Sequence, residues 1–492
     1  MRRGVLFNPA PRSGWQAQRR IELPLGLRSV ASPLEQAGWK VRIVEEYGNR
    51  QWRQELLEAL REEAVCFGVT SMTGPQLLHA ISACTVVRER RPGLPVVWGG
   101  IHASLLPEQT LRSGWADFVV VGEGEATLLQ LVETLAAKGA PAQVAGLAYL
   151  ENGRFCATAP RPYVDLDQQP PLSYHLVNMD HYRRRLFGMD HVSFNSSRGC
   201  TFRCSFCWDS VLHGRKWRAM QPSTVMEHLR RVVRDYGIRG FLFTDDCFFV
   251  DLERARGILE EVVRSGLGLS ISKLQIRADM VCKMDREFFD LLVRANVRRL
   301  TVGVESGSQP MLDLLRKDVT VEQVVQANQL LKPYPIVPVY LFMMALPGET
   351  PEQFEQSIKL AIRLTDENPR AVKTFNVYTP YPGTELYEMT LKSGFRPPQR
   401  LEDWAGFNFR HVQHDAPWVD PQTRRLVEGL DFPLMFLGKG HFVTPYKRTN
   451  RLVVNLSRLY YPLARYRVKH LDVRFPLETK LARALGIFGR QD

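Results

Sequence analysis

Short apolar segments alternate with amphipathic stretches in two regions of the chain. In residues 1–150 the apolar segments predict five strands, at 4–8, 41–44, 65–70, 95–98 and 117–121. The stretches between them, such as 51–61 and 75–90, have helical periodicity. Strands connected through helices pair in parallel, with helices on both faces of the sheet. We therefore expect residues 1–150 to form a doubly wound, flavodoxin-like α/β domain.

A second alternating region covers residues 191–400 and follows a connector at 151–190 that is rich in Pro, Asp and aromatic residues. Six strands are expected, at 192–195, 240–244, 270–275, 300–304, 337–343 and 372–377, with helices such as 224–236 and 351–366 between them. Six such units predict a partial (β/α)6 barrel, with its chemistry at the carboxyl ends of the strands. Residues 401–492 lose this pattern, and we expect a mixed C-terminal region of basic and apolar residues.

Composition narrows the class of protein. The chain is 45% hydrophobic and 24% charged, which is typical of globular proteins and excludes dominant disorder. No run of about 18 apolar residues occurs, so no membrane-spanning helix is expected. The first residues lack the apolar core of a secretory signal. Three of the eight cysteines fall within residues 200–207, which favours a metal site in the reducing cytoplasm over a disulfide framework.

The strongest chemical signal is the cysteine motif Cys200-Thr-Phe-Arg-Cys204-Ser-Phe-Cys207, which follows the strand expected at 192–195. Three thiolates on one loop can hold a single inorganic cluster, and thiolate is the usual ligand of iron–sulfur clusters. A [4Fe–4S] cluster held by three cysteines keeps one iron open for a further ligand. Two other interpretations remain at this point. One is a zinc site with His213 as its fourth ligand, and the other is a chance grouping of core cysteines.

A C-x3-C-x2-C motif at the first strand of a partial barrel resembles the radical S-adenosylmethionine enzymes. The domain before it resembles the cobalamin-binding domain of their largest class, so the resemblance covers about residues 1–400. Other segments recur at the same relative places: Ser197–Cys200, Asp245-Asp246, Gly303–Gly307, Leu346–Thr350 and Tyr381–Thr384. The resemblance implies a [4Fe–4S] cluster, S-adenosylmethionine at its open iron, and cobalamin. In this family one electron cleaves S-adenosylmethionine and yields a radical that abstracts hydrogen from an unactivated carbon.

The resemblance also suggests residues that bind S-adenosylmethionine. Asp245 and Asp246, where the family usually has a Gly-Gly-Glu-like run, could accept its ammonium hydrogens or cap the next helix. Arg277 suits the methionine carboxylate as a bidentate donor, or else forms a salt bridge at the barrel rim. Glu305 could accept the ribose hydroxyls, with Ser306 close by.

Loops at the predicted strand ends of the first domain are expected to bind cobalamin. These residues are Ser71, Met72, Thr73, Gly99, Gly100, His102, Gly122, Glu123 and Gly124, although tight turns alone would also explain any single loop. Many cobalamin domains carry Asp-x-His-x-x-Gly after their first strand, whereas the loop 9–15 here has no histidine. The resemblance therefore implies cobalamin without a histidine lower ligand. His102 would line the corrin or the nucleotide loop, and water or Met72 would cover the cobalt.

Together these features predict a cobalamin-dependent C-methyltransferase that acts on an unactivated carbon of a hydrophobic lipid or natural product. The alternative is a cobalamin-dependent radical cyclase, rearrangement or oxidative enzyme that does not methylate, as in tetrapyrrole ring formation. A non-catalytic iron–sulfur or corrinoid sensor is a further hypothesis from another class. No second, ferredoxin-like cysteine motif is present, so an external flavodoxin or ferredoxin is implied as the electron donor.

Charge is concentrated at the end of the chain. The net charge is +13, and residues 439–492 hold twelve Lys or Arg against three Asp or Glu. This segment mixes its cations with Leu, Val, Phe and Tyr, and no RNA-binding appendage is recognisable, so nucleic acid is not expected as a partner. Two interpretations remain: a C-terminal subdomain that packs beside the active site, or peripheral contact with acidic lipid headgroups.

Overall fold

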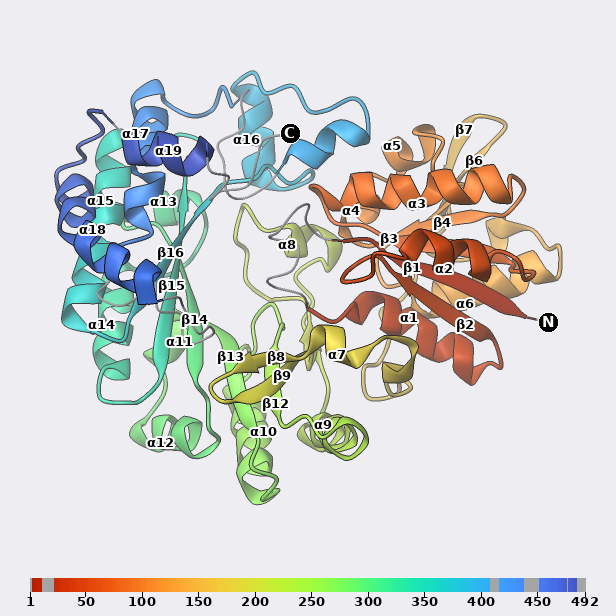
Figure 1. The fold of residues 1–492 in the computed structure, drawn as a ribbon, viewed down its shortest axis with the longest axis horizontal. Helices are drawn as coiled ribbons and strands as arrows, with labels where there is room; N and C mark the ends of the chain where they lie inside the picture. Colours follow the sequence, from red (N-terminus) through yellow and green to blue (C-terminus); the bar gives the residue numbers. More distant parts are fainter. Residues whose placement is uncertain (1, 11–21, 408–415, 438–450, 476, 485–492) are drawn as a thin grey trace. The chain divides into compact units, whose positions relative to one another are not determined.

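The structure is a computed structural model that describes residues 2–10, 22–407, 416–437, 451–475 and 477–484 (Figure 1). The chain divides into two compact units. The first contains Met1–Tyr182, Val211–His213 and Pro397–Asn408, and the second contains Arg183–Ser210, Gly214–Arg396 and Phe409–Asp492. Much of the predicted loop 9–15 and of the basic segment 439–492 lies outside the described residues.

The first unit is built on a seven-stranded sheet of order β2-β1-β3-β4-β5-β6-β7. Its parallel strands are β1 (Arg3–Asn8), β2 (Lys40–Glu45), β3 (Cys66–Thr70), β4 (Val96–Gly99) and β5 (Phe118–Val120). The five predicted strands and their flavodoxin-like order are confirmed. The antiparallel hairpin β6 (Leu147–Glu151) and β7 (Arg154–Ala157) was not predicted, although its turn, Asn152-Gly153, has positive φ at both residues and is a strong hairpin signal.

Helices cover both faces of this sheet. α1 (Leu25–Gln36) packs against α6 (Glu125–Ala136), and α2 (Trp52–Ala59) packs against α3 (Gln76–Arg90) (Figure 1). The shorter elements are α4 (Ile101–Leu105), α5 (Pro107–Arg112), α7 (Met179–Tyr182) and the 3-10 turns η2 (Pro141–Gln143) and η3 (Tyr174–Leu176). A late segment, Pro397–Asn408, returns to this unit, and its turn η4 (Glu402–Gly406) packs on α3.

The second unit contains a curled half-barrel sheet of order β16-β15-β14-β13-β12-β9-β8 (Figure 1). Its six parallel strands are β9 (Met189–Phe194), β12 (Gly240–Phe243), β13 (Ser270–Arg277), β14 (Arg299–Glu305), β15 (Val337–Met344) and β16 (Val372–Val377). All six predicted strands are confirmed. β8 (Arg184–Leu186) adds an antiparallel edge, and β10 (Ser197–Arg198) pairs separately with β11 (Arg218–Ala219).

An outer layer of helices covers the half-barrel. The long helices are α9 (Pro222–Tyr236), α10 (Leu252–Arg264), α12 (Arg286–Arg294), α14 (Val321–Leu331) and α15 (Pro351–Glu367). The short helices are α11 (Ala278–Val281), α13 (Gln309–Leu314) and α16 (Glu385–Lys392), while α8 (Trp208–Leu212) directly follows the cysteine motif. α14 was not predicted, although Thr320 and Gln323 form a capping box at its start.

Three helices follow the half-barrel, namely α17 (Pro421–Leu434), α18 (Arg451–Lys469) and α19 (Leu477–Ala484). The irregular sequence pattern did not predict them, partly because Pro462 lies inside α18. α18 and α19 both pack on α17, where the ring of Tyr460 contacts Phe432 and Phe436. Within the described ranges, the chain has no helix whose length and hydropathy would let it cross a membrane.

Candidate active site

The three motif cysteines lie on the loop that leaves β9. Backbone hydrogen bonds anchor this loop at Ser205, whose N–H donates to Leu315 O and whose carbonyl accepts from Leu386 N, each at 2.9 Å. Cys204 is buried, and Cys200 and Cys207 are half-buried. Burial raises the pKa of Cys200 to about 11, and the charge of Cys204 makes a smaller contribution in the same direction. Burial also raises the pKa of Cys207, and Cys204 again contributes.

This donor set fits an iron–sulfur cluster. Within the described ranges, no three His, Cys, Asp or Glu side chains converge on one metal ion. Each thiolate of a [4Fe–4S] cluster binds a different iron, so the cluster needs its thiols spaced around a wider volume than a single ion does. His213, the proposed fourth zinc ligand, instead places its ring 6.0 Å from that of Tyr163 in the first unit.

Arg277, at the end of β13, holds the cysteine loop. Its Nη1 lies 4.0 Å from Cys204 Sγ, and its guanidinium carbon lies 3.8 Å from the ring centroid of Phe202. Its Nη2 donates to the carbonyls of Lys317 and Asp318, and its Nε donates to Asp279 at 2.9 Å. The side chain is only 6% exposed. Through these contacts the guanidinium of Arg277 holds the cysteine loop in place, next to the expected position of the methionine carboxylate.

Glu305 forms a buried ion pair that sequence reasoning missed. Lys317 Nζ lies 2.7 Å from Glu305 Oε1, and the two side chains are 7% and 10% exposed. Burial alone would lower the pKa of Lys317, but the charges of Glu305 and Cys204 raise it above its usual value. Gly303 leaves room for this pair, since a Cβ there would lie 2.6 Å from Glu305 Oε1. Glu305 itself has φ +68°, a strained conformation that turns the chain at the strand end.

Asp245 is buried and supports the segment before Cys200. Its carboxylate accepts hydrogen bonds from Ser196 N at 2.8 Å, Ser196 Oγ at 2.6 Å and Ser197 Oγ at 2.7 Å. Burial raises the pKa of Asp245 in spite of these donors. Both carboxylate oxygens are therefore already engaged by the protein.

Asp246 interacts with Asp209, a second residue that sequence reasoning did not single out. Burial raises the pKa of both carboxyl groups. The negative charge of Asp245 raises the pKa of Asp246 further, and that of Asp246 raises the pKa of Asp209 further. Asp246 also accepts a backbone hydrogen bond from Gly199, next to Cys200. Two carboxyl groups in one buried place hold a proton more readily than isolated ones.

The next strand ends form tight turns. Ser306 is fully buried, and its Oγ lies 3.2 Å from Ser357 Oγ on α15. After β15, Ala345 has φ +60°, and its carbonyl accepts from the indole of Trp418 at 3.1 Å. Glu349 in this turn is 2% exposed, and burial raises its pKa to about 8.

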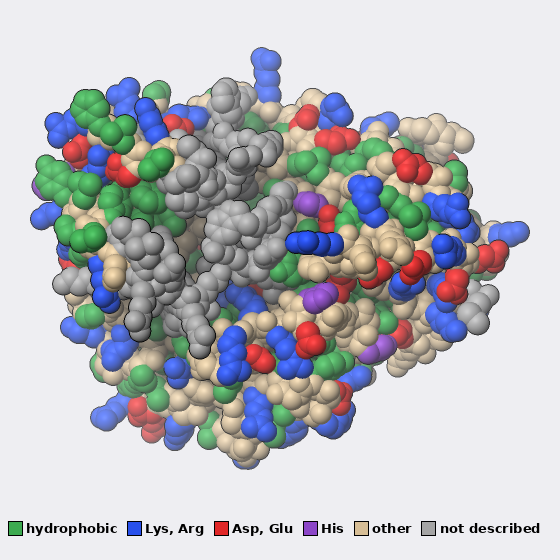
Figure 2. Space-filling model, viewed as in Figure 1, with side chains coloured by type: hydrophobic (Ala, Val, Ile, Leu, Met, Phe, Trp, Pro, Cys, Tyr) green, Lys and Arg blue, Asp and Glu red, His purple; other side chains and the backbone are tan. Residues whose placement is uncertain are grey.

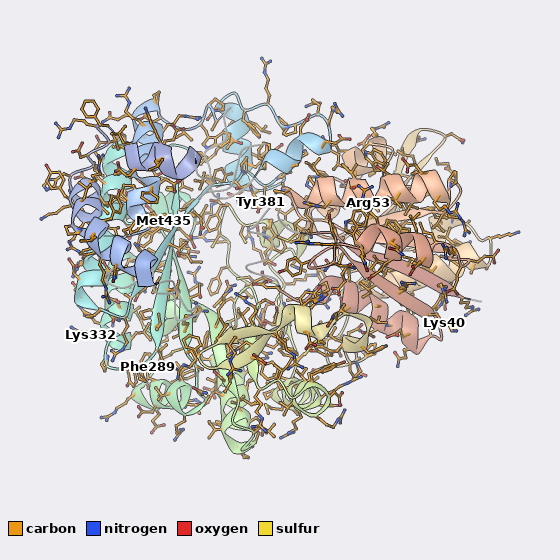
Figure 3. All side chains as sticks on the ribbon, in the orientation of Figure 1. Lys40, Arg53, Phe289, Lys332, Tyr381 and Met435 are labelled. Carbon is orange, nitrogen blue, oxygen red and sulfur yellow. The ribbon has the colours of Figure 1, made fainter. Side chains whose placement is uncertain are left out.

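Two further side chains lie by the cysteines. Tyr381 (Figure 3) follows β16, and burial, then the charge of Cys207, raises its pKa. Cys247 is 3% exposed, and burial, then the charge of Cys200, raises its pKa to about 12. Nothing in the sequence distinguishes Cys247 from an ordinary core cysteine, because its place beside Cys200 depends on the pairing of β12 with β9.

In the first unit, the predicted cobalamin loops gather at the carboxyl edge of the parallel sheet, since parallel strands end on the same side. Ser71 N donates to Gly99 O at 3.0 Å, and His102 N donates to Ser71 O at 3.2 Å. Gly100 has φ +90°, and a Cβ there would lie 2.6 Å from Ser71 O. The ends of β3 and β4 therefore pack backbone against backbone, and Gly100 is required for this close approach.

His102 is 1% exposed, and its Nδ1 lies 3.0 Å from Thr73 Oγ1. Its Nε2 is buried and has no hydrogen-bond partner among the described residues. Burial lowers the pKa of His102 to about 4. The ring of Trp404, from the returning segment, lies 5.8 Å away. By contrast, Met72 is 51% exposed at the end of β3.

The loop after β5 joins this edge. Gly122 has φ +77°, and its N–H donates to Ser104 Oγ at 3.0 Å. The Glu123 carboxylate accepts from Val164 N at 3.1 Å, while a Cβ at Gly124 would lie 3.0 Å from Val30. Closely packed backbone turns, an exposed thioether and an imidazole nitrogen without a partner among the described residues fit a large, flat group such as a corrin.

Comparison with known proteins gives matches to both units. A model of the Radical SAM superfamily matches residues 194–361, and a model of the B12 binding domain matches residues 20–132. An uncharacterised methyltransferase of Pyrococcus horikoshii is 30% identical over 75% of this chain and 78% of its own length. The anaerobic magnesium-protoporphyrin IX monomethyl ester cyclase of Cereibacter sphaeroides is 28% identical over 80% of this chain and 64% of its own length.

The hopanoid C-3 methylase of Methylococcus capsulatus is 28% identical over 82% of this chain and 75% of its own length. Among solved structures, the methyltransferase TsrM from Kitasatospora setae, with cobalamin and a [4Fe–4S] cluster bound, matches 98% of this chain and 99% of its own chain. The TM-score is 0.71 at 18% identity, so this likeness concerns the fold. The cofactors of the present chain are cobalamin, a [4Fe–4S] cluster and S-adenosylmethionine. The chain belongs to the cobalamin-dependent radical S-adenosylmethionine methyltransferase family.

Proposed function

We propose that this enzyme adds a methyl group to an unactivated carbon of a hydrophobic small molecule, a lipid or natural product. The observation that carries the proposal is the concave face of the half-barrel. Along β15, Tyr340 is buried and donates to Asn328 on α14, so residues of its parity face the helices. The residues of the other parity, Val339, Leu341 and Met343, are half-buried on the concave side and offer an apolar wall to a substrate.

Cys200, Cys204 and Cys207 would hold the cluster in this proposal. When bound, the cluster and S-adenosylmethionine supply a hydrogen-abstracting radical and cobalamin supplies the methyl group. Arg277 would position the cysteine loop and place one edge of its guanidinium near the methionine carboxylate, and Asp245 would hold the loop from beneath.

The other predicted residues would contact S-adenosylmethionine itself. The Asp246 carboxyl would accept the ammonium hydrogens. Glu305, held by Lys317, would accept the ribose hydroxyls, and Ser306 would shape the turn beside it.

In the first unit we propose that Ser71, Met72 and Thr73 lie under the corrin, together with Gly99 and Gly100. His102, Gly122, Glu123 and Gly124 would border the nucleotide loop. His102 would line the nucleotide loop rather than ligate cobalt, because its ring, Nε2 included, is buried beside Trp404. Met72 would cover the lower face of the cobalt.

A second candidate is an oxidative cyclase that does not methylate, and the similarity to the magnesium-protoporphyrin cyclase favours it. An anaerobic assay separates the two. The reconstituted enzyme is incubated with lipid and natural-product extracts, reductant and S-adenosylmethionine labelled in its methyl group. Methylation predicts a product heavier by one labelled methylene, whereas cyclisation predicts an unlabelled product that has lost hydrogen. Absence of corrin absorbance under every loading condition would overturn both.

Radical S-adenosylmethionine enzymes in general use an electron donor and a small-molecule substrate. For this chain we propose a flavodoxin or ferredoxin as the donor, and the cytoplasm as its compartment, in contact with the membrane surface. Reduction of the cluster by a purified flavodoxin, followed by its electron paramagnetic resonance signal, would test the donor.

A further inference from the structure

The helices at the end of the second unit expose an unusual number of large apolar side chains. Among the described residues, six of the thirteen large hydrophobic side chains that are exposed belong to α18, α19 and the turn between them. They are Leu459, Leu463, Tyr466, Phe475, Leu477 and Leu481, and they range from 48% exposed at Leu463 to 81% at Phe475. In Figure 2 hydrophobic side chains gather over α17 and α19, among Lys and Arg. We call these six residues the apolar face.

The apolar face on α18 follows the helical period. Leu459, Leu463 and Tyr466 are spaced i, i+4 and i+7, and therefore lie on one side of the helix. The opposite side is occupied, because Ala464 and Val468 are fully buried. One side of α18 thus holds the unit together, and the other leaves its large apolar side chains in water. Leu477 and Leu481 repeat the i, i+4 spacing on α19.

The cations of this region whose side chains are described divide into two groups. Arg465, Arg467 and Arg474 are used within the unit, where they pair with Asp366, Glu478 and Asp472. Arg458, Lys469 and Lys480 are exposed and have no ion-pair or hydrogen-bond partner within the described ranges. At 100° per residue, Arg458 and Lys469 lie about 90° around α18 from the centre of the apolar face. Unpaired positive charge therefore borders an exposed apolar stripe.

We propose that the apolar face docks on the surface of a membrane that contains anionic lipids. Leucine and aromatic side chains gain free energy when they enter the boundary between headgroups and acyl chains, and bordering Lys and Arg reach anionic headgroups. The acidic residues of the region are already paired with arginine, so they would not repel such a surface. This inference does not depend on which reaction the enzyme catalyses.

Co-sedimentation of the full-length protein with vesicles tests the proposal. We expect the protein to pellet with vesicles of phosphatidylcholine and phosphatidylglycerol but to bind pure phosphatidylcholine far more weakly. Binding should weaken as the salt concentration rises, because salt screens the attraction between lysine or arginine and headgroups.

Two sets of variants locate the surface. L459Q/L463Q is expected to weaken binding by roughly tenfold or more, since burial of each leucine supplies the affinity. L57Q/L78Q changes two leucines of the first unit that are 40% and 50% exposed, and should bind as the wild type does. R458Q/K469Q/K480Q should lose roughly fivefold for each cation. K283Q/K332Q/K392Q removes the same charge from exposed sites elsewhere in the second unit and serves as its control.

Several results would overturn the proposal. The wild type could fail to pellet with anionic vesicles, or both test variants could bind as well as their controls. If L459Q/L463Q lowers the thermal unfolding midpoint and leaves vesicle binding unchanged, the face packs against the chain's own residues. Retention on immobilised polyglutamate, without vesicle binding, would assign the face to an acidic protein instead.

Discussion

Buried charged side chains organise the carboxyl edge of the half-barrel around the cysteine loop, whereas backbone conformation organises the ends of β3 and β4 in the first unit. At the half-barrel, Arg277 and the Lys317–Glu305 pair lie buried beside the cysteine loop. In the first unit, Gly100 lets the end of β4 pack directly on the Ser71 backbone, and His102 is uncharged. A cluster with three thiolates is small and anionic and needs nearby cations. A corrin is large and flat, and needs an unobstructed surface.

The largest expected effect is loss of the cluster. Cys204→Ala removes the thiol that Arg277 contacts, so formation of 5′-deoxyadenosine should fall to background and the iron content should drop. The corrin loaded in the first unit should remain, because no cysteine ligand is expected there. C156A, which removes a half-buried thiol of the first unit, is the control and should keep full activity. Full activity in C204A would contradict the assignment of the cluster.

Breaking the buried ion pair should cost the next largest amount. Lys317→Met leaves Glu305 without its partner at 10% exposure, and we expect a loss of about 3–5 kcal/mol in the free energy of unfolding. The double variant K317M/E305L should recover much of this loss, since it buries no lone charge. Urea unfolding followed by circular dichroism measures both. An equal loss in the two variants would show that packing, rather than charge, makes the pair important.

The sequence predicts the features that depend on local pattern and misses those that depend on contacts formed during folding. The strands of both parallel sheets follow from apolar segments separated by helices, and the cysteine motif is local. Asp209 could not be anticipated, because it meets Asp246 only after β9 and β12 have paired. Lys317 meets Glu305 only because the chain folds back through α13. Trp404 reaches His102 by a return of the chain to the first unit, which no local pattern signals. α18 runs through Pro462, against its local propensity.

The glycine turn at the end of β4 gives a smaller effect. Gly100→Ala places a Cβ 2.6 Å from Ser71 O at φ +90°, and should cost about 1–3 kcal/mol of unfolding free energy. It should also lower the amount of corrin retained after gel filtration, read from corrin absorbance per protein. Gly93→Ala is the matched control, since Gly93 lies before β4, outside the proposed corrin surface, and a Cβ there has no neighbour within 4 Å. Equal corrin retention in the two variants would contradict the proposed role of this loop.

The smallest effect concerns a feature that the two units share, a buried neutral histidine. Burial lowers the pKa of His102 and of His191 to about 4 in each case. The unfolded chain binds these protons near pH 6.5, so each histidine contributes stability above that pH and loses it as the pH falls toward 4. Between pH 7.5 and 5, each should account for about 2 kcal/mol of the lost unfolding free energy.

The variants H102Q and H191Q should each flatten the fall in urea stability between these pH values, and H175Q, whose side chain is 62% exposed, should not. Besides burial, the charges of Arg184 and Arg299 lower the pKa of His191, and the hydrogen bond to Met189 O and the charge of Asp190 raise it, whereas burial lowers the pKa of His102. Added salt should therefore change the contribution of His191 and leave that of His102 unchanged. The same salt dependence in both would mean that nearby charge acts on His102 as well.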